Sequence, residues 1–272
     1  MNHIRHLLTE SVASDQYERQ VANYINQLNP QICQAERPKV STAYSDVLVT
    51  YRNKSAWLEV KMNHTDNIGN PRVYYSDDEG GWNTTYDTPA ARFCVDLLNE
   101  SEEAAEWIMN FKKWLCLKAK ESDDEKLLAI TRNGKARPNN IKIVLPTTLS
   151  GLRLPNAVPL EIIREYVEEI GSRYVMRYNG DITDLVTEHY VNGKEEPAYY
   201  MQAGDDLYKI SDVNPFHWNV PLFEVPEGTC HIRIATRSSF CEIQSEIKIK
   251  RMEPSPYSLC PWSKKKLPFK KA

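Results

Sequence analysis

Three ionisable residues, Asp46, Glu59 and Lys61, lie in one short segment that otherwise alternates apolar and polar residues. Residues 44–63 read YSDVLVTYRNKSAWLEVKMN, and alternation on both sides of a polar turn is typical of a β-hairpin. Two carboxylates brought together in this way repel each other, and a divalent cation relieves that repulsion. Hard oxygen ligands suit Mg²⁺, with Mn²⁺ as a substitute. We expect the Val60 carbonyl as a further ligand, and Lys61 to orient a metal-polarised water or stabilise a phosphate oxygen.

The register of this hairpin decides whether the three residues share one face of the sheet. We expect a turn at residues 52–55, which places Val47 opposite Val60 and Asp46 opposite Lys61. Opposite residues share a face and side chains alternate along a strand, so Glu59 joins Asp46 and Lys61 on the side away from Val60. A slip of one residue would separate Asp46 from the other two. The expected apolar face carries Val47, Val49, Tyr51, Leu58 and Val60, and the opposite face also carries Leu48, Thr50 and Trp57.

Asp46 followed by Glu59-Val60-Lys61 resembles the D…(D/E)xK signature of the restriction-endonuclease-like, or PD-(D/E)xK, nucleases. The resemblance implies Mg²⁺-dependent hydrolysis of a phosphodiester bond, with Asp46 and Glu59 as metal ligands and Lys61 acting on the nucleophilic water. In that family a helix before the hairpin often supplies a further Glu, and Glu18 matches this position as an auxiliary catalytic residue. Ser45 stands where the idealised motif has Pro, and no Q-x-x-x-Y helix follows Lys61.

The non-functional alternative for the same residues is a solvated hairpin face with a weak cross-strand ion pair. Leu48 and Trp57 on that face favour partial burial instead. A second E-x-K, Glu246-Ile247-Lys248, provides an internal comparison, because no Asp precedes it on a partner strand. For Glu18, the alternative is an ordinary solvated position on an amphipathic helix.

Two groups of basic residues are candidates for DNA contacts. Arg132, Lys135 and Arg137 lie in a turn-like stretch that could hold phosphates, and an ordinary polar turn is the alternative. Arg233 and Arg237 share one face of an expected strand, where a solvated outer face is equally compatible. The C-terminal lysines, at 264–266 and 270–271, are interpreted as a loose cationic end.

The composition indicates an ordinary soluble globular protein, with 272 residues, 41% hydrophobic residues and a net charge of -3. DNA contacts would therefore come from a local basic patch. Six cysteines without C-x-x-C spacing predict buried free thiols in a reducing compartment. The first residues do not resemble a signal peptide, and no membrane-spanning segment is evident, so a cytoplasmic protein is the default expectation.

The elements that must position these residues follow from local patterns. We expect helices over 14–29, 89–120 with a break at Ser101, and 159–171, because apolar residues there recur at spacings of three and four. We expect a loop over 69–89, strands at 126–130 and 141–146, a hairpin over 185–201 with Asn192-Gly193 as its turn, and strands over 230–252. The fold class expected is α/β, with a restriction-endonuclease-like core of mixed β-sheet flanked by helices over 1–150. A β-rich C-terminal half, 151–272, packs on the core and is a candidate for DNA recognition.

The function expected is that of a Mg²⁺-dependent endodeoxyribonuclease acting on double-stranded DNA, in the form of a sequence-specific type II restriction endonuclease. A homodimer would match a palindromic site, and no small-molecule organic cofactor or membrane partner is expected. Two alternatives stay open: a structure-specific nuclease for junction resolution, repair or phage DNA processing, and a non-catalytic DNA-binding protein that retains the fold. RNA also stays open as a substrate, because the motif addresses a phosphate.

Overall fold

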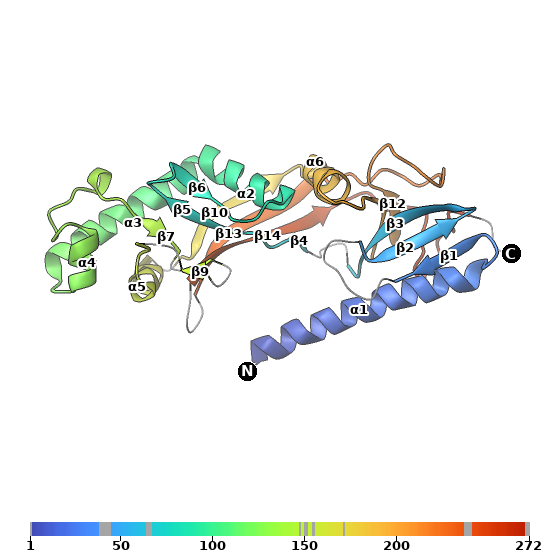
Figure 1. Cartoon of the computed structure of the whole chain (residues 1–272), viewed down its shortest axis with the longest axis horizontal. Coiled ribbons are helices and arrows are strands. Elements are labelled where there is room, and N and C mark those ends of the chain that lie inside the picture. Colours follow the sequence, from blue (N-terminus) through green and yellow to red (C-terminus); the bar gives the residue numbers. More distant parts are fainter. Residues whose placement is uncertain are drawn as a thin grey trace. The chain divides into compact units, whose positions relative to one another are not determined.

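The computed structural model describes residues 2–37, 45–63, 67–146, 148–149, 152–153, 156–170, 172–236 and 241–269 (Figure 1). The chain forms two compact units. Unit 1 comprises Met1–Asp66, Gly180–Gly228 and Lys248–Ala272, and unit 2 comprises Asn67–Asn179 and Thr229–Ile247. The expected boundary between residues 150 and 151 lies outside the described residues. Both halves of the sequence contribute to both units, because the chain passes between them more than once.

Unit 1 is built on a mixed five-stranded sheet with the order β1-β2-β3-β11-β12. Neighbouring strands are antiparallel except β3 and β11, which are parallel. Parallel neighbours need a long crossover connection, and here more than a hundred residues separate β3 from β11 in the sequence. The strands are β1 (Cys33–Glu36), β2 (Val47–Tyr51), β3 (Lys54–Lys61), β11 (Ala198–Ala203) and β12 (Asp206–Lys209).

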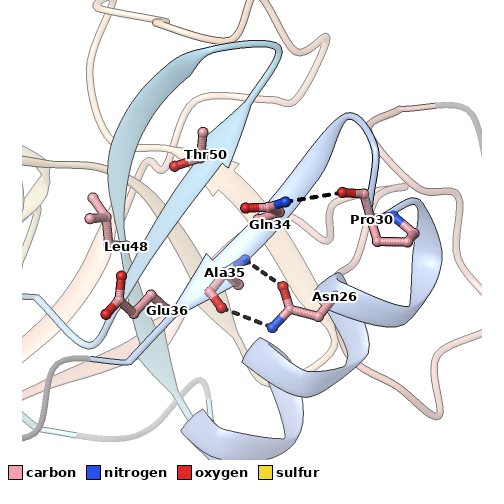
Figure 2. Close-up of a pocket in the computed structure, with 7 residues that line it drawn as sticks. All are labelled: Asn26, Pro30, Gln34, Ala35, Glu36, Leu48 and Thr50. Atoms are coloured by element: carbon pink, nitrogen blue, oxygen red, sulfur yellow. Dashed lines mark hydrogen bonds between the residues drawn. The ribbon is translucent and has the colours of Figure 1, made fainter.

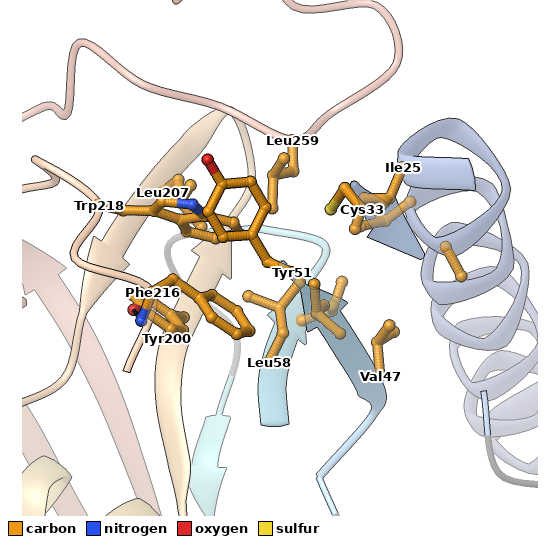
Figure 3. Packing of buried hydrophobic residues seen from close by; sticks show 14 of the residues in the cluster. Ile25, Cys33, Val47, Tyr51, Leu58, Tyr200, Leu207, Phe216, Trp218 and Leu259 are labelled. Carbon is orange, nitrogen blue, oxygen red and sulfur yellow. Dashed lines mark hydrogen bonds between the residues drawn. The ribbon is translucent and has the colours of Figure 1, made fainter. Parts of the chain in front are cut away.

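Helix α1 (Asn2–Leu28) covers one face of this sheet with the apolar stripe predicted from the sequence. Tyr17, Val21 and Ile25 are buried against the inward side chains of β2 and β3. The helix begins well before Ser14, so the expected N-cap was wrong, whereas its end before Asn29 is as expected. Figure 3 shows the aromatic side of this core, which contains Tyr51, Tyr200, Phe216 and Trp218.

The exposed edge of the sheet, strand β1, is protected by a side chain from α1. Asn26 donates to the Ala35 carbonyl at 2.9 Å and accepts from the Ala35 N–H at 2.7 Å, as Figure 2 shows. The amide thereby takes the place of a neighbouring strand and satisfies two edge groups that could otherwise pair with another chain. A pocket of about 350 Å³ lies beside this contact, lined in part by Glu36 and Leu48.

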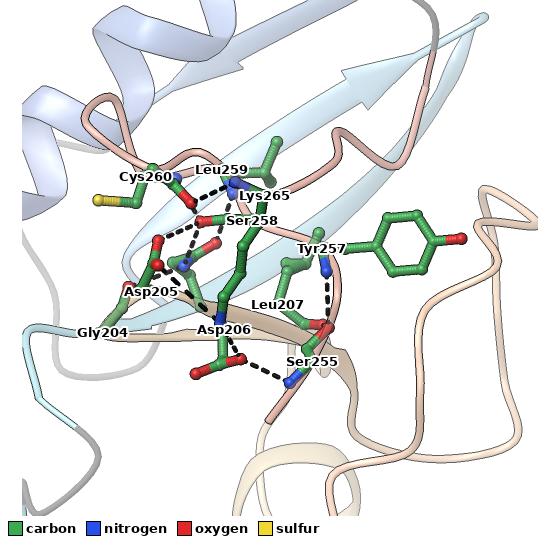
Figure 4. A network of polar contacts seen from close by, with 12 residues as sticks. Gly204, Asp205, Asp206, Leu207, Ser255, Tyr257, Ser258, Leu259, Cys260 and Lys265 are labelled. Atoms are coloured by element: carbon green, nitrogen blue, oxygen red, sulfur yellow. Dashed lines mark hydrogen bonds and ion pairs between the residues drawn. The ribbon is translucent and has the colours of Figure 1, made fainter. Parts of the chain in front are cut away.

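The C-terminal segment is docked on unit 1 as far as residue 269. Lys265 forms an ion pair with Asp206 at 2.5 Å, and Asp206 also accepts from the Ser255 N–H (Figure 4). Phe269 is buried in the core. The expectation of a loose cationic end was therefore wrong for residues 264–266, while residues 270–271 lie outside the described residues.

A second sheet has the strand order β10-β13-β14-β5-β6, with β4 paired to β14 and β7 to β5. The hairpin of β5 and β6 corrects the expected loop over 69–89, where Trp82 is buried. Its strands are β4 (Asn67–Gly69), β5 (Arg72–Ser76), β6 (Gly81–Asn83), β7 (Val144–Leu145), β10 (Tyr174–Gly180), β13 (Glu227–Thr236) and β14 (Cys241–Arg251). A separate pair is formed by β8 (Thr148–Leu149) and β9 (Leu152–Arg153).

The helices of unit 2 are α2 (Pro89–Glu100), α3 (Glu102–Glu121), α4 (Glu125–Ile130), α5 (Leu160–Ile170) and the short η1 (Pro138–Asn140). Ser101 separates α2 from α3 and caps α3 by accepting from the Ala104 N–H, as predicted. The stretch expected as a strand at 126–130 is helix α4 instead, because Asp124 caps it by accepting two backbone N–H groups. Of the strand expected at 141–146, only β7 forms.

The architecture is thus mixed α/β, with β10–β14 supplying the β-rich C-terminal half. The described cysteine side chains are buried free thiols, as predicted: Cys33, Cys94, Cys116, Cys230 and Cys260. Across the described ranges, each helix is either too short or too polar to cross a lipid bilayer.

Candidate active site

The β2–β3 hairpin turns through two residues, Arg52 and Asn53, rather than the four expected. Their φ angles of 49° and 66° are typical of a type I′ turn, which matches the twist of the flanking strands. Val47 consequently lies opposite Leu58, so the expected pairing of Val47 with Val60 was wrong by two residues. A shift of two keeps every side chain on its expected face, because side chains alternate with a period of two.

The observed ladder ends at Val47 and Leu58, and extending its register by one residue places Asp46 opposite Glu59 instead of opposite Lys61. The pairing alternates along the ladder, and the closing pair, Tyr51 and Lys54, is hydrogen-bonded. Asp46 and Glu59 therefore occupy a non-hydrogen-bonded position, where opposite side chains lie closest together. The extended register thus makes the two carboxylates cross-strand neighbours, and the charge of Glu59 contributes to the raised pKa of Asp46.

The Asp46 carboxylate ends the ladder by replacing a backbone acceptor. Continued pairing would join the Val60 N–H to Ser45, but that N–H donates to Asp46 Oδ2 at 2.8 Å instead. The N–H and C=O of one strand residue point toward the same neighbouring strand. The Val60 carbonyl is accordingly directed toward the end of β2, where Asp46 lies.

Glu59 is buried and held by two ammonium groups. Its side chain is 6% exposed, and Lys61 Nζ lies 2.8 Å from Oε1. Lys194 Nζ lies 3.4 Å from Oε2 and 3.3 Å from the Ser45 hydroxyl. A carboxylate this deeply buried needs such partners, because its desolvation is otherwise costly.

These contacts separate the pKa values of the two carboxyl groups. Burial and the negative charge of Glu59 raise the pKa of Asp46 to about 8. Burial acts in the same direction on Glu59, but Lys61 and Lys194 outweigh it and hold the pKa of Glu59 below its usual value. Burial opposes the charge of Lys61, yet Glu59 raises the pKa of Lys61 well above its usual range. Without a cation, Asp46 therefore holds a proton more firmly than Glu59 does.

Glu18 lies on α1 beside this group, and its charge contributes to the raised pKa of Asp46. Its carboxylate is engaged by Arg37, whose Nη2 lies 2.6 Å from Oε2. Arg37 also pairs with Asp15. Glu18 is thus close enough to act on Asp46 through its charge, while Arg37 neutralises much of it.

Three residues near the site, His189, Tyr190 and Lys194, escaped the sequence interpretation. The expected hairpin over 185–201 is wrong: α6 (Thr183–Thr187) continues into the π-helix η2 (Glu188–Asn192), and Lys194 follows in the turn before β11. The aromatic and β-branched residues suggested strands. The better signal was the helical spacing of the buried side chains Ile182, Leu185, Val186 and Tyr190.

The two side chains on η2 stay uncharged beside the lysines. Burial and the charge of Lys194 lower the pKa of His189 to about 4. Burial raises the pKa of Tyr190 far above its usual value, so its hydroxyl remains a donor. Within the described part of the chain, neither the Tyr190 hydroxyl nor the His189 Nδ1 makes a hydrogen bond of normal geometry. The Lys61 ammonium is close enough to counteract part of the effect of burial on the pKa of Tyr190.

The donor set fits a hard divalent cation that keeps much of its own water. Asp46, Glu59 and the Val60 carbonyl would be the ligands, and Mg²⁺ commonly binds through one or two carboxylates with several retained waters. Among the residues described, no three His, Cys, Asp or Glu side chains form a metal-binding group. An all-protein cage is therefore not what these residues offer.

The basic residues proposed for DNA contacts belong to unit 2. Arg132, Lys135 and Arg137 are exposed in the loop after α4, and the turn there starts at Arg132 with φ of 53°. Arg233 is half-buried on β13, opposite in direction to the buried Ile232 and Ile234, as the alternation predicted. Arg237 lies outside the described residues.

No protein-family model, curated protein or solved structure matches this chain.

Proposed function

We propose that this chain is a Mg²⁺-dependent phosphodiesterase that acts as an endonuclease on double-stranded DNA. The observation that carries the proposal is the proximity of Asp46 and Glu59 where the β2–β3 ladder ends, with Lys61 bonded to Glu59. The order of α1, the hairpin and a mixed sheet also agrees with a restriction-endonuclease-like core.

The roles of the protein groups follow from their charges and positions. Asp46, Glu59 and the Val60 carbonyl would hold the ion, which when bound polarises a water and a phosphate oxygen. Lys61 holds the orientation of Glu59 and is the ammonium group best placed to align the attacking water or stabilise developing negative charge. Glu18 is auxiliary, since it acts on Asp46 through its charge while paired with Arg37.

DNA as the substrate and a homodimer as the active form belong to the same proposal. Exposed Arg132, Lys135 and Arg137, together with Arg233, would supply contacts to phosphates that position a duplex. Two-fold symmetry would match a palindromic sequence. Mn²⁺ is expected to substitute for Mg²⁺, because both accept hard oxygen ligands.

Cleavage of supercoiled plasmid and labelled oligonucleotides tests this function directly. The native chain should cut with Mg²⁺ or Mn²⁺ and stop with EDTA, whereas Asp46→Asn and Lys61→Met should fold and lose cutting. The second E-x-K provides a matched control, because Glu246→Gln and Lys248→Gln should retain the native rate. Equal cutting by the native chain, Asp46→Asn and Lys61→Met would show that the site is assigned wrongly.

The same assay separates the alternatives. Discrete plasmid fragments favour a sequence-specific enzyme, and cutting confined to branched substrates favours a structure-specific nuclease. A chain that binds duplex DNA in Ca²⁺ and never cuts in Mg²⁺ or Mn²⁺ would be a non-catalytic DNA-binding protein. Preferential cutting of RNA would replace DNA as the substrate.

A further inference from the structure

The π-helix η2 carries a buried hydroxyl that the fold does not use. Tyr190 is 1% exposed, and its hydroxyl makes no hydrogen bond of normal geometry among the described residues, although the Lys61 ammonium is close enough to act on its pKa. The His189 Nδ1 also has no hydrogen bond among these residues. A buried polar atom without a hydrogen bond destabilises the fold, so each such atom calls for an explanation. π-Helical turns are rare and occur frequently at functional sites.

The surroundings of Tyr190 are strongly cationic. Lys61 Nζ lies 5.6 Å and Lys194 Nζ 5.3 Å from the centroid of its ring. Glu59 forms ion pairs with both ammonium groups, and its contact with Lys61, at 2.8 Å, is the shorter of the two. Lys194 is therefore a second cation on a carboxylate that already has a close partner, and it also contacts the neutral Ser45 hydroxyl and the ring of Tyr190.

We infer that Tyr190 and Lys194 form a binding subsite for a non-bridging oxygen of the substrate phosphate. This inference rests on the proposed function and specifies which groups recognise the phosphodiester. A non-bridging phosphate oxygen accepts hydrogen bonds and carries negative charge, so it satisfies the unused hydroxyl and the loosely held ammonium together. A cation bound by Glu59 would compete with Lys194 for that carboxylate and release the ammonium toward the phosphate.

Tyr190→Phe gives the sharpest test, because it removes only the hydroxyl. Since that hydroxyl makes no hydrogen bond of normal geometry with the described residues, the variant should unfold at the same or a higher urea concentration than the native chain. Its kcat should fall roughly 10- to 100-fold, as for the loss of one hydrogen bond to a charged group. Its affinity for a labelled duplex in Ca²⁺ should also fall. Lys194→Gln should lower both kcat and duplex affinity in the same way.

Tyr208→Phe is the matched control from the same unit. Its hydroxyl donates to the Glu253 carbonyl at 2.7 Å, so its removal should lower stability and leave kcat and duplex affinity unchanged. Native kcat and duplex affinity in Tyr190→Phe would overturn the subsite and indicate that the hydroxyl bonds only to water. The same holds if Tyr190→Phe loses activity only in proportion to lost stability.

The two proposals can fail separately. If the native chain binds the duplex in Ca²⁺, never cuts, and loses affinity in Tyr190→Phe and Lys194→Gln, the subsite stands and the hydrolytic function fails. If the native chain cuts and both variants cut and bind normally, the function stands and the subsite fails. A native chain that neither binds nor cuts overturns both.

Discussion

Replacing Asp46 by Asn should stabilise the metal-free protein at neutral and alkaline pH while abolishing its proposed activity. Asn keeps the shape of the side chain and an oxygen that can accept from the Val60 N–H, so the end of the ladder is preserved. What the substitution removes is a carboxyl group that burial and Glu59 make costly to ionise. The perturbation therefore isolates the electrostatic crowding on which the proposed metal site depends.

The expected magnitude follows from the pKa of Asp46. That pKa rises from 3.8 in the free side chain to about 8 in the folded protein. The folded chain holds the Asp46 proton more tightly than the unfolded chain does. The stability that this proton provides is therefore fully present below pH 3.8, the pKa in the unfolded chain, and is lost as the pH rises toward about 8. Each pKa unit corresponds to about 1.4 kcal/mol, and the influence of Lys61 is already contained in the pKa of Asp46. From about pH 5 to about pH 7.5, the advantage of Asp46→Asn over the native chain in free energy of unfolding should grow by about 3 kcal/mol.

Urea unfolding followed by tryptophan fluorescence, in EDTA and over this pH range, measures the difference. His189 has the opposite dependence, since its lowered pKa gives stability that is complete above 6.5 and is lost as the pH falls toward about 4. His189 is present in both proteins, so comparing the two largely cancels its contribution. Asp212→Asn, whose carboxylate is 99% exposed, controls for the loss of one charge.

A difference in unfolding free energy that stays constant with pH would refute the reasoning. Asp46 would then be ionised in the folded metal-free chain, and the two carboxylates would not crowd each other. Mg²⁺ provides a second check, because a ligand that binds the folded state stabilises it. Mg²⁺ should stabilise the native chain more than Asp46→Asn at about pH 7.5.

Three further substitutions test the fold around the site and in unit 2. Lys112→Met leaves Asp77 without its ion pair, formed at 2.8 Å by a lysine that is 8% exposed, and should lower the urea-unfolding free energy by about 2–4 kcal/mol. Asn26→Ala removes both hydrogen bonds to Ala35, which should cost about 1–2 kcal/mol and increase self-association on size-exclusion chromatography. Leu58→Ala leaves a cavity in the core of unit 1 and should cost about 2–5 kcal/mol. Unchanged unfolding midpoints in these variants would contradict the contacts described.

Local patterns predicted those parts of the molecule whose conformation depends on neighbours in the sequence. The apolar stripe of α1, the cap at Ser101 and the faces of β2 and β3 all follow from periodicity or capping within a few residues. The same reasoning failed where local signals were ambiguous. Asn192-Gly193 suggested a hairpin turn, yet the buried spacing from Ile182 to Tyr190 is helical.

The hairpin shows why a face can be predicted more reliably than a register. Alternation alone determines which side chains share a face, and a two-residue error leaves that assignment unchanged. The choice of a two-residue turn depends on the left-handed φ of Arg52 and Asn53, which the composition of the turn did not reveal. Extending the observed register by one residue therefore places Asp46 opposite Glu59 rather than opposite Lys61.

The sequence by itself determined the chemistry available to this protein: two carboxylates and a lysine on one face of a hairpin, preceded by a helix that carries Glu18. Only the tertiary structure decided which distant groups complete that face. Lys194 and Tyr190 are more than a hundred residues from Glu59 in the sequence, and the parallel pairing of β11 with β3 brings their segment beside it. Such contacts depend on burial and long-range packing, and no local spacing encodes them.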